Sequence, residues 1–120
     1  MKVLIVDDDA DILHMIVKLA EHRGHTVCAC NSPFGVSAVV MRELPDVVVL
    51  DMMMPGLSGS ALAELIKRMD LPTPPKVVLW SAMEDEQLAS EGQRLGLPVV
   101  SKSTRPSVLI EMIERLVLPA

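Results

Sequence analysis

The stretch Val47-Val48-Val49-Leu50-Asp51 decides the fold, because four apolar residues run without a break into a carboxylate. Strands that are buried on both faces of a parallel sheet have this continuous apolar composition. Residues 3–6 (VLIV) and 77–80 (VVLW) repeat the type, and residues 26–30 and 97–100 are weaker candidates. We therefore expect five strands, most of them buried on both faces.

Segments with helical spacing of apolar residues alternate with these strands. The apolar stripes are Ile12, Ile16 and Leu19; Val36, Val39 and Val40; Leu62, Leu65, Ile66 and Met69; and Leu109, Met112, Ile113 and Leu116. Residues 84–95 are less regular, but their acidic start suits a helix N-terminus. The alternation predicts a doubly wound α/β fold, a five-stranded parallel sheet with five helices, as one domain over residues 1–120.

Residues with known helix-end preferences support these boundaries. Polar side chains stand where they could cap helices that begin with proline: Ser32 ahead of Pro33, and Ser103 or Thr104 ahead of Pro106. Glycines stand where helices would stop, at Gly24 and Gly96. We also expect Asp9 to cap the first helix.

Composition excludes several classes of protein. The chain has 120 residues, half of them apolar, which suits one buried core, and no apolar run approaches the about 20 residues that span a bilayer. A formal charge of -5 gives no electrostatic reason to bind nucleic acid. Cys28 and Cys30 fit a reducing compartment and are best interpreted as small buried hydrophobes. We expect a cytoplasmic protein without a membrane or nucleic-acid partner.

Polar residues follow four of the predicted strands. Asp7, Asp8 and Asp9 follow the first, Asp51 ends the third, Ser81-Ala82 follow the fourth, and Lys102 follows the fifth. In a doubly wound sheet, ligands bind at the carboxyl ends of the strands. The sequence therefore predicts that carboxylates, one hydroxyl and one ammonium group converge at one edge.

Several carboxylates in one crevice repel each other and favour a bound cation. Mg²⁺ takes oxygen ligands and commonly combines one or two carboxylates with phosphate oxygens, so Asp7, Asp8 and Asp51 suit Mg²⁺ (or Mn²⁺). Lys102 and the Ser81 hydroxyl would stabilise an incoming phosphoryl group, and an aspartate can itself be the nucleophile.

At these residues the sequence resembles the receiver domain of two-component response regulators, the CheY-like superfamily. The matching pieces are residues 4–9 (LIVDDD), 45–59 (PDVVVLDMMMPGLSG), 80–82 (WSA) and Lys102, in this order. The resemblance covers nearly the whole chain. It implies a flavodoxin-like fold with strand order 2-1-3-4-5.

The resemblance also implies roles for individual residues. Asp51 would accept a phosphoryl group from a histidine kinase or histidine phosphotransfer protein, while Asp7, Asp8, Asp51 and the backbone carbonyl of Met53 hold the metal. Lys102 would pair with the phosphoryl group, and Ser81, next to Ala82, would move to hydrogen-bond it. Such a domain is a signalling switch and not an enzyme beyond its own phosphorylation and dephosphorylation. It acts on a downstream protein target or a fused output domain.

The sequence departs from the family pattern at two positions. The aromatic residue usual three positions before the lysine is replaced by Val99, which puts the usual signalling relay in doubt. Ser103 stands where a proline commonly follows through a cis bond, so a trans bond or a strained cis bond is expected. Met53 and Met83 occupy positions that tune water access, and their apolar cover predicts slow loss of phosphate.

Two other classes of function stay open at this point. Asp7-x-Asp9 after a strand resembles the nucleophile motif of haloacid-dehalogenase-type phosphatases, although Asp11 stands where that motif has a small or hydroxylated residue. A phosphate-independent pseudo-receiver would explain Val99 and Ser103 but not the intact acidic set. In receivers the last two helices often bind targets or form homodimers, and Val108, Leu109 and Leu116 offer apolar area there.

Overall fold

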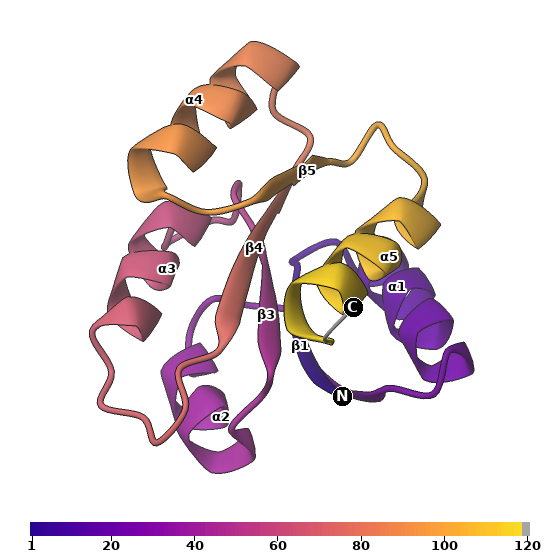
Figure 1. The fold of residues 1–120 in the computed structure, drawn as a ribbon. Helices are drawn as coiled ribbons and strands as arrows, with labels where there is room; N and C mark the ends of the chain where they lie inside the picture. Colours follow the sequence, from indigo (N-terminus) through magenta and orange to yellow (C-terminus); the bar gives the residue numbers. More distant parts are fainter. Residues whose placement is uncertain (119–120) are drawn as a thin grey trace.

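The computed structural model describes residues 1–118 and contains five strands that alternate with five helices (Figure 1). In chain order these elements are β1 Lys2–Val6, α1 Ala10–His22, β2 Thr26–Cys30, α2 Val36–Glu43, β3 Val47–Asp51, α3 Gly59–Lys67, β4 Lys76–Ser81, α4 Asp85–Leu95, β5 Val99–Ser101 and α5 Pro106–Val117. All paired strands are parallel, in the order β2-β1-β3-β4-β5. The predicted fold class and strand order are confirmed.

Two apolar cores lie on the two faces of the sheet. On one face, α1 and α5 pack against the strand residues of alternate positions, such as Val3 and Val49. On the other face, α2, α3 and α4 pack against the intervening positions, such as Leu4 and Leu50 (Figure 1). β1 and β3 therefore need apolar residues at every position, which is why their sequences are continuous apolar runs.

Helix ends agree with the sequence at several points. The Asp9 carboxylate accepts hydrogen bonds from the N–H groups of Asp11 and Ile12, so it caps α1 as expected. Gly96 ends α4 with a φ of 68°, in the left-handed region that favours glycine. The least regular predicted helix, at 84–95, is present as α4.

For two helices, α2 and α5, the predicted N-terminal capping residue was wrong. α2 begins at Val36, because the Ser32 hydroxyl accepts from the N–H of Phe34 and closes a turn instead of capping a helix at Pro33. α5 does begin at Pro106, but Arg105 precedes it and offers no side-chain cap.

Hydrogen bonds within the β5–α5 connection explain why neither predicted cap of α5 forms. Ser103 bonds the Ser101 hydroxyl, and the Thr104 hydroxyl donates to the Ser101 carbonyl. No peptide bond within residues 1–118 is cis, so the Lys102–Ser103 bond is trans.

β2 is an edge strand, and this changes the interpretation of its cysteines. Cys28 and Cys30 are free thiols that are half-buried against the core rather than fully buried. Burial raises the pKa of both thiols. Within residues 1–118, no helix is both long enough and apolar enough to cross a membrane.

Candidate functional site

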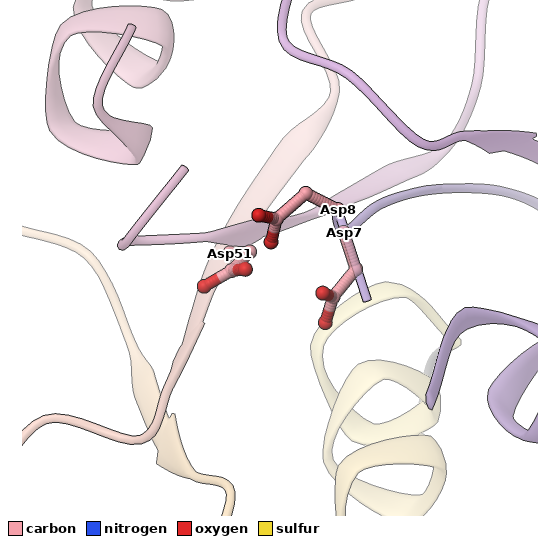
Figure 2. A group of neighbouring side chains, drawn as sticks. All are labelled: Asp7, Asp8 and Asp51. Carbon is pink, nitrogen blue, oxygen red and sulfur yellow. The ribbon is translucent and has the colours of Figure 1, made fainter. Parts of the chain in front are cut away.

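The carboxyl ends of the central strands bring the predicted acidic residues together. Asp7 follows β1 and Asp51 is the last residue of β3, and these two strands are neighbours in the sheet. Figure 2 shows Asp7, Asp8 and Asp51 gathered at this edge, and one carboxylate oxygen from each lies within 4.8 Å of the others. Asp7 and Asp51 are buried, whereas Asp8 is exposed. The predicted convergence is therefore present, with its open side at Asp8.

Lys102 adds the ammonium group to this cluster. Its Nζ lies 2.8 Å from Asp7 Oδ2 and 3.3 Å from Asp51 Oδ2, so one cation bridges two buried carboxylates. The backbone holds it there, because the Lys102 N–H donates to the Ser81 carbonyl at the end of β4. Burial alone lowers the pKa of Lys102, but the hydrogen bond and charge of Asp7 and the charge of Asp51 outweigh it, and the net shift is upward. Lys102 therefore stays protonated.

Backbone N–H groups orient the two buried carboxylates. Asp7 Oδ1 accepts from the N–H of Asp9 at 2.9 Å, and Asp51 Oδ1 accepts from the N–H of Met53 at 3.0 Å. Each aspartate bonds the residue two positions later, which is an Asx turn. These two backbone donors were missed in the sequence analysis. The presence of an aspartate directly after a strand and before a loop was a signal that could have predicted them.

The electrostatic balance of the cluster is unfavourable for the charged form of Asp51. The pKa of Asp51 is raised to about 7, mainly by burial and also by the charge of Asp7. The hydrogen bond from the Met53 N–H and the Lys102 ammonium lower this pKa but offset only part of the rise. Three carboxylates thus face one cation. A hard divalent ion would compensate the remaining negative charge with the oxygen ligands that it prefers, so the donor set fits Mg²⁺.

Ser81, Ala82 and Met53 have more peripheral places. Ser81 is buried at the end of β4, and its hydroxyl accepts from the Met83 N–H at 3.0 Å, closing the turn into α4 instead of contacting Asp51. Ala82 is exposed beside it. Met53 is 60% exposed, and the role of its carbonyl stays a prediction.

Val99 contacts α4 at a glycine. A Cβ on Gly92 would lie 2.5 Å from Val99 Cγ1, so helix and strand meet there more closely than any side chain on Gly92 would allow. Gly59, the first residue of α3, approaches the backbone of Asp51 in the same way, because a Cβ there would collide with the Asp51 carbonyl oxygen. The contact of Gly92 could not be predicted from the sequence, since a glycine inside a predicted helix does not identify what it approaches.

The apolar residues predicted for the last helix divide between the core and the surface. Leu109 is fully buried against the sheet, Leu116 is half-buried, and Val108 is 41% exposed. Of these three residues, Val108 is therefore the exposed one that could contribute to a dimer interface. Dimer formation through the last two helices stays a prediction.

Comparison with known proteins identifies the family. The family model for the response regulator receiver domain matches residues 3–114. The phosphate regulon transcriptional regulatory protein PhoB of Pseudomonas aeruginosa is 32% identical over 114 residues, which are 95% of this chain and 49% of PhoB. Protein PilH of the same organism is 31% identical over 96 residues, covering 79% of this chain and 78% of PilH.

Solved structures agree with this assignment. The BeF3-activated N-terminal receiver domain of Klebsiella pneumoniae RstA superimposes with a TM-score of 0.84 at 25% identity, covering all of both chains. The receiver domain of a Francisella response regulator gives 0.83 at 26% identity, over 96% of this chain and 94% of that one. The chain spans about half the length of PhoB, so it corresponds to one part of that relative. The chain therefore belongs to the response regulator receiver domain family.

Proposed function

We propose that Asp51 accepts a phosphoryl group from a phosphohistidine of a histidine kinase or histidine phosphotransfer protein and that the chain acts as a signalling switch. The observation that carries the proposal is the joint position of Asp51, Asp7 and Lys102, in which one ammonium group contacts both buried carboxylates. Phosphoryl transfer needs positioning and charge stabilisation more than covalent chemistry by the protein, and this arrangement supplies both.

The residues have distinct parts in the reaction. An oxygen of the Asp51 carboxylate attacks phosphorus, a new O–P bond forms, and the N–P bond to the histidine breaks with its electron pair left on nitrogen. The Met53 N–H binds Oδ1 of Asp51. Oδ2, the oxygen that faces Lys102, is then left for the attack. Lys102 would then pair with the added phosphoryl oxygens.

Asp7, Asp8 and Asp51 would hold the divalent cation, with the Met53 carbonyl as a further ligand. A bound Mg²⁺ supplies positive charge to the phosphoryl oxygens. The fit rests on the carboxylate oxygens within 4.8 Å of one another and on the excess of negative charge around Lys102.

The direct test is phosphorylation by a small donor. The protein is incubated with Mg²⁺ and acetyl phosphate, and intact mass is measured beside an Asp51→Asn variant and a sample with EDTA. One added phosphoryl group that requires Mg²⁺ and is lost in Asp51→Asn supports the proposal. No addition, together with no fluorescence change of Trp80 on adding Mg²⁺, would contradict it and favour the phosphate-independent pseudo-receiver.

Trp80 is a suitable reporter because it pairs with Asp51 across the sheet and is fully buried. The same samples test two further expectations. Rapid turnover of a phosphate monoester would favour the haloacid-dehalogenase-type phosphatase instead. The decay of the phosphorylated mass tests the slow loss of phosphate predicted from Met53 and the half-buried Met83.

A further inference from the structure

The cation of the acidic cluster belongs to a residue that lies just outside the regular elements. β5 ends at Ser101, which pairs with Ser81 of β4, so Lys102 is the first residue beyond the strand. Lysine carries its charge at the end of a flexible four-carbon chain. The position of the Lys102 ammonium group, 2.8 Å from Asp7 Oδ2 and 3.3 Å from Asp51 Oδ2, therefore depends on the backbone on both sides of Lys102.

The sheet supports this backbone on one side only. Before the side chain of Lys102, its N–H donates to the Ser81 carbonyl at 2.7 Å. After it, residues 102–105 (KSTR) connect the sheet to α5 (Figure 1), and none of the four is a hydrophobic residue. No side chain of this connection is therefore suited to anchor it in an apolar core, and its shape depends on hydrogen bonds.

Hydrogen bonds from the residues after Lys102 converge on Ser101. The Ser101 hydroxyl accepts from the N–H of Ser103 at 3.1 Å and lies 2.7 Å from the Ser103 hydroxyl. The Ser101 carbonyl accepts from the N–H of Thr104 at 3.1 Å and from the Thr104 hydroxyl at 2.7 Å. Lys102 thus lies inside a turn whose far side is tied to the residue directly before it.

A hollow beside this turn offers the Lys102 side chain another place. It has a volume of about 500 Å³, and its lining includes Ser101, Lys102 and Ser103 from the turn and Glu84 and Asp85 from the start of α4. Glu84 and Asp85 are exposed, and their carboxylates attract an ammonium group as the buried ones do. A move into the hollow would also return the ammonium group to water, which favours the exposed position. Charge alone therefore does not hold Lys102 in the cluster.

We propose that Ser101 is a positioning residue for phosphorylation, because its hydroxyl and carbonyl hold the turn that keeps Lys102 on Asp7 and Asp51. The inference rests on the proposed function, in which Lys102 pairs with the phosphoryl group on Asp51. A small displacement of such a group is enough to lower the rate of a reaction that depends on positioning.

The first test measures the position of Lys102 without phosphorylation. With EDTA present, the protein is acetylated briefly with an N-hydroxysuccinimide ester, and peptide mass spectrometry gives the labelling of Lys102 relative to the exposed Lys18. This ratio should rise about threefold or more in Ser101→Ala, in line with the loss of one or two hydrogen bonds, and return to the wild-type value in Ser101→Thr. Ser107→Ala, which removes an exposed hydroxyl from the first turn of α5, should leave it unchanged. Circular dichroism checks that the variants fold.

The second test asks whether Ser101 acts through Lys102. Ser101→Ala should slow phosphorylation by acetyl phosphate about threefold or more, and Ser101→Thr should restore the rate. In a Lys102→Ala background, Ser101→Ala should cost nothing further, because the group that it positions is gone. Neutralising the hollow with Glu84→Gln and Asp85→Asn should return part of the lost rate to Ser101→Ala.

The outcomes separate this inference from the proposed function. Unchanged labelling of Lys102 in Ser101→Ala, or an equal loss of rate with and without Lys102, would overturn the positioning role. A wild-type protein that takes up no phosphoryl group would contradict the proposed function, while the labelling ratio would still decide whether Ser101 holds Lys102 in the cluster.

Discussion

Replacing the phosphoacceptor by a neutral isostere should stabilise the fold. Burial raises the pKa of Asp51 from 3.8 to about 7, which corresponds to a cost of about 4 kcal/mol for keeping the charged form in the native state. The cluster opens to water beside the exposed Asp8, so we reduce this figure by half for screening. Asp51→Asn should therefore raise the free energy of unfolding by about 2 kcal/mol above pH 7.

The pH dependence of this gain has a definite sign. A carboxyl whose pKa is raised on folding binds its proton more tightly in the native state, so wild-type stability falls as pH rises from about 4 to about 7. Asparagine does not titrate and avoids this loss. The gain from Asp51→Asn should be close to zero at pH 4, grow through this window and level off above pH 7. Mg²⁺ should reduce it, because a divalent cation favours the charged carboxylate.

Urea denaturation followed by far-UV circular dichroism measures the gain across this pH range with EDTA present. At pH 8 the melting temperature of Asp51→Asn should rise by about 8 °C. Asp70→Asn is the matched control, because Asp70 is exposed and makes no side-chain hydrogen bond or ion pair within residues 1–118. A variant less stable than wild type at pH 8, or a gain independent of pH, would refute the reasoning from carboxylate repulsion.

Three further perturbations probe other contacts. Gly92→Ala should destabilise by about 1–2 kcal/mol in urea denaturation because its Cβ meets Val99, and combining it with Val99→Ala should restore most of the loss. Gly59→Ala should destabilise by about 2 kcal/mol and weaken Mg²⁺ binding, measured by Trp80 fluorescence, because the new Cβ pushes on the Asp51 carbonyl. The hydrogen bond from the Arg23 guanidinium lowers the pKa of Glu114 to about 2, so the charged Glu114 stabilises the fold at pH values above its unfolded pKa. Glu114→Gln should therefore lower the melting temperature at pH 7 but not at pH 2.

The fold and most of the acidic site could be predicted because the signals are continuous in the sequence. Strands buried on both faces require uninterrupted apolar runs, and parallel order brings their carboxyl ends to one edge. The residue after each run is therefore placed by the strand itself. Asp51 and Asp7 needed no information from distant parts of the chain, and Lys102 is fixed by one backbone hydrogen bond to the end of β4.

Helix starts were harder to predict because competing local hydrogen bonds are nearly equal in energy. Ser32 could cap a helix or close a turn, and the turn prevails because Gly35 takes a φ of 83° before α2 begins. Ser81 shows the same ambiguity. Its hydroxyl serves the β4–α4 turn in this structure, and contact with a phosphoryl group on Asp51 would require it to leave the Met83 N–H.

Val99 illustrates a contact that no single position of the sequence could indicate. The family pattern usually has an aromatic residue at this position, and Val99 in its place puts the usual signalling relay in doubt. The structure pairs Val99 with Gly92, seven positions earlier on α4, and the two fit so closely that even one carbon on the glycine would collide. α4 buries only Leu88 and Gly92, and Leu95 packs partly buried against the same core, so this contact is one of the few that hold α4 to the sheet. A larger side chain at position 99 would have to displace the helix. The valine at 99 and the glycine at 92 therefore depend on each other. If β5 moves, it would displace α4 directly through this close contact, without the rotation of an aromatic ring.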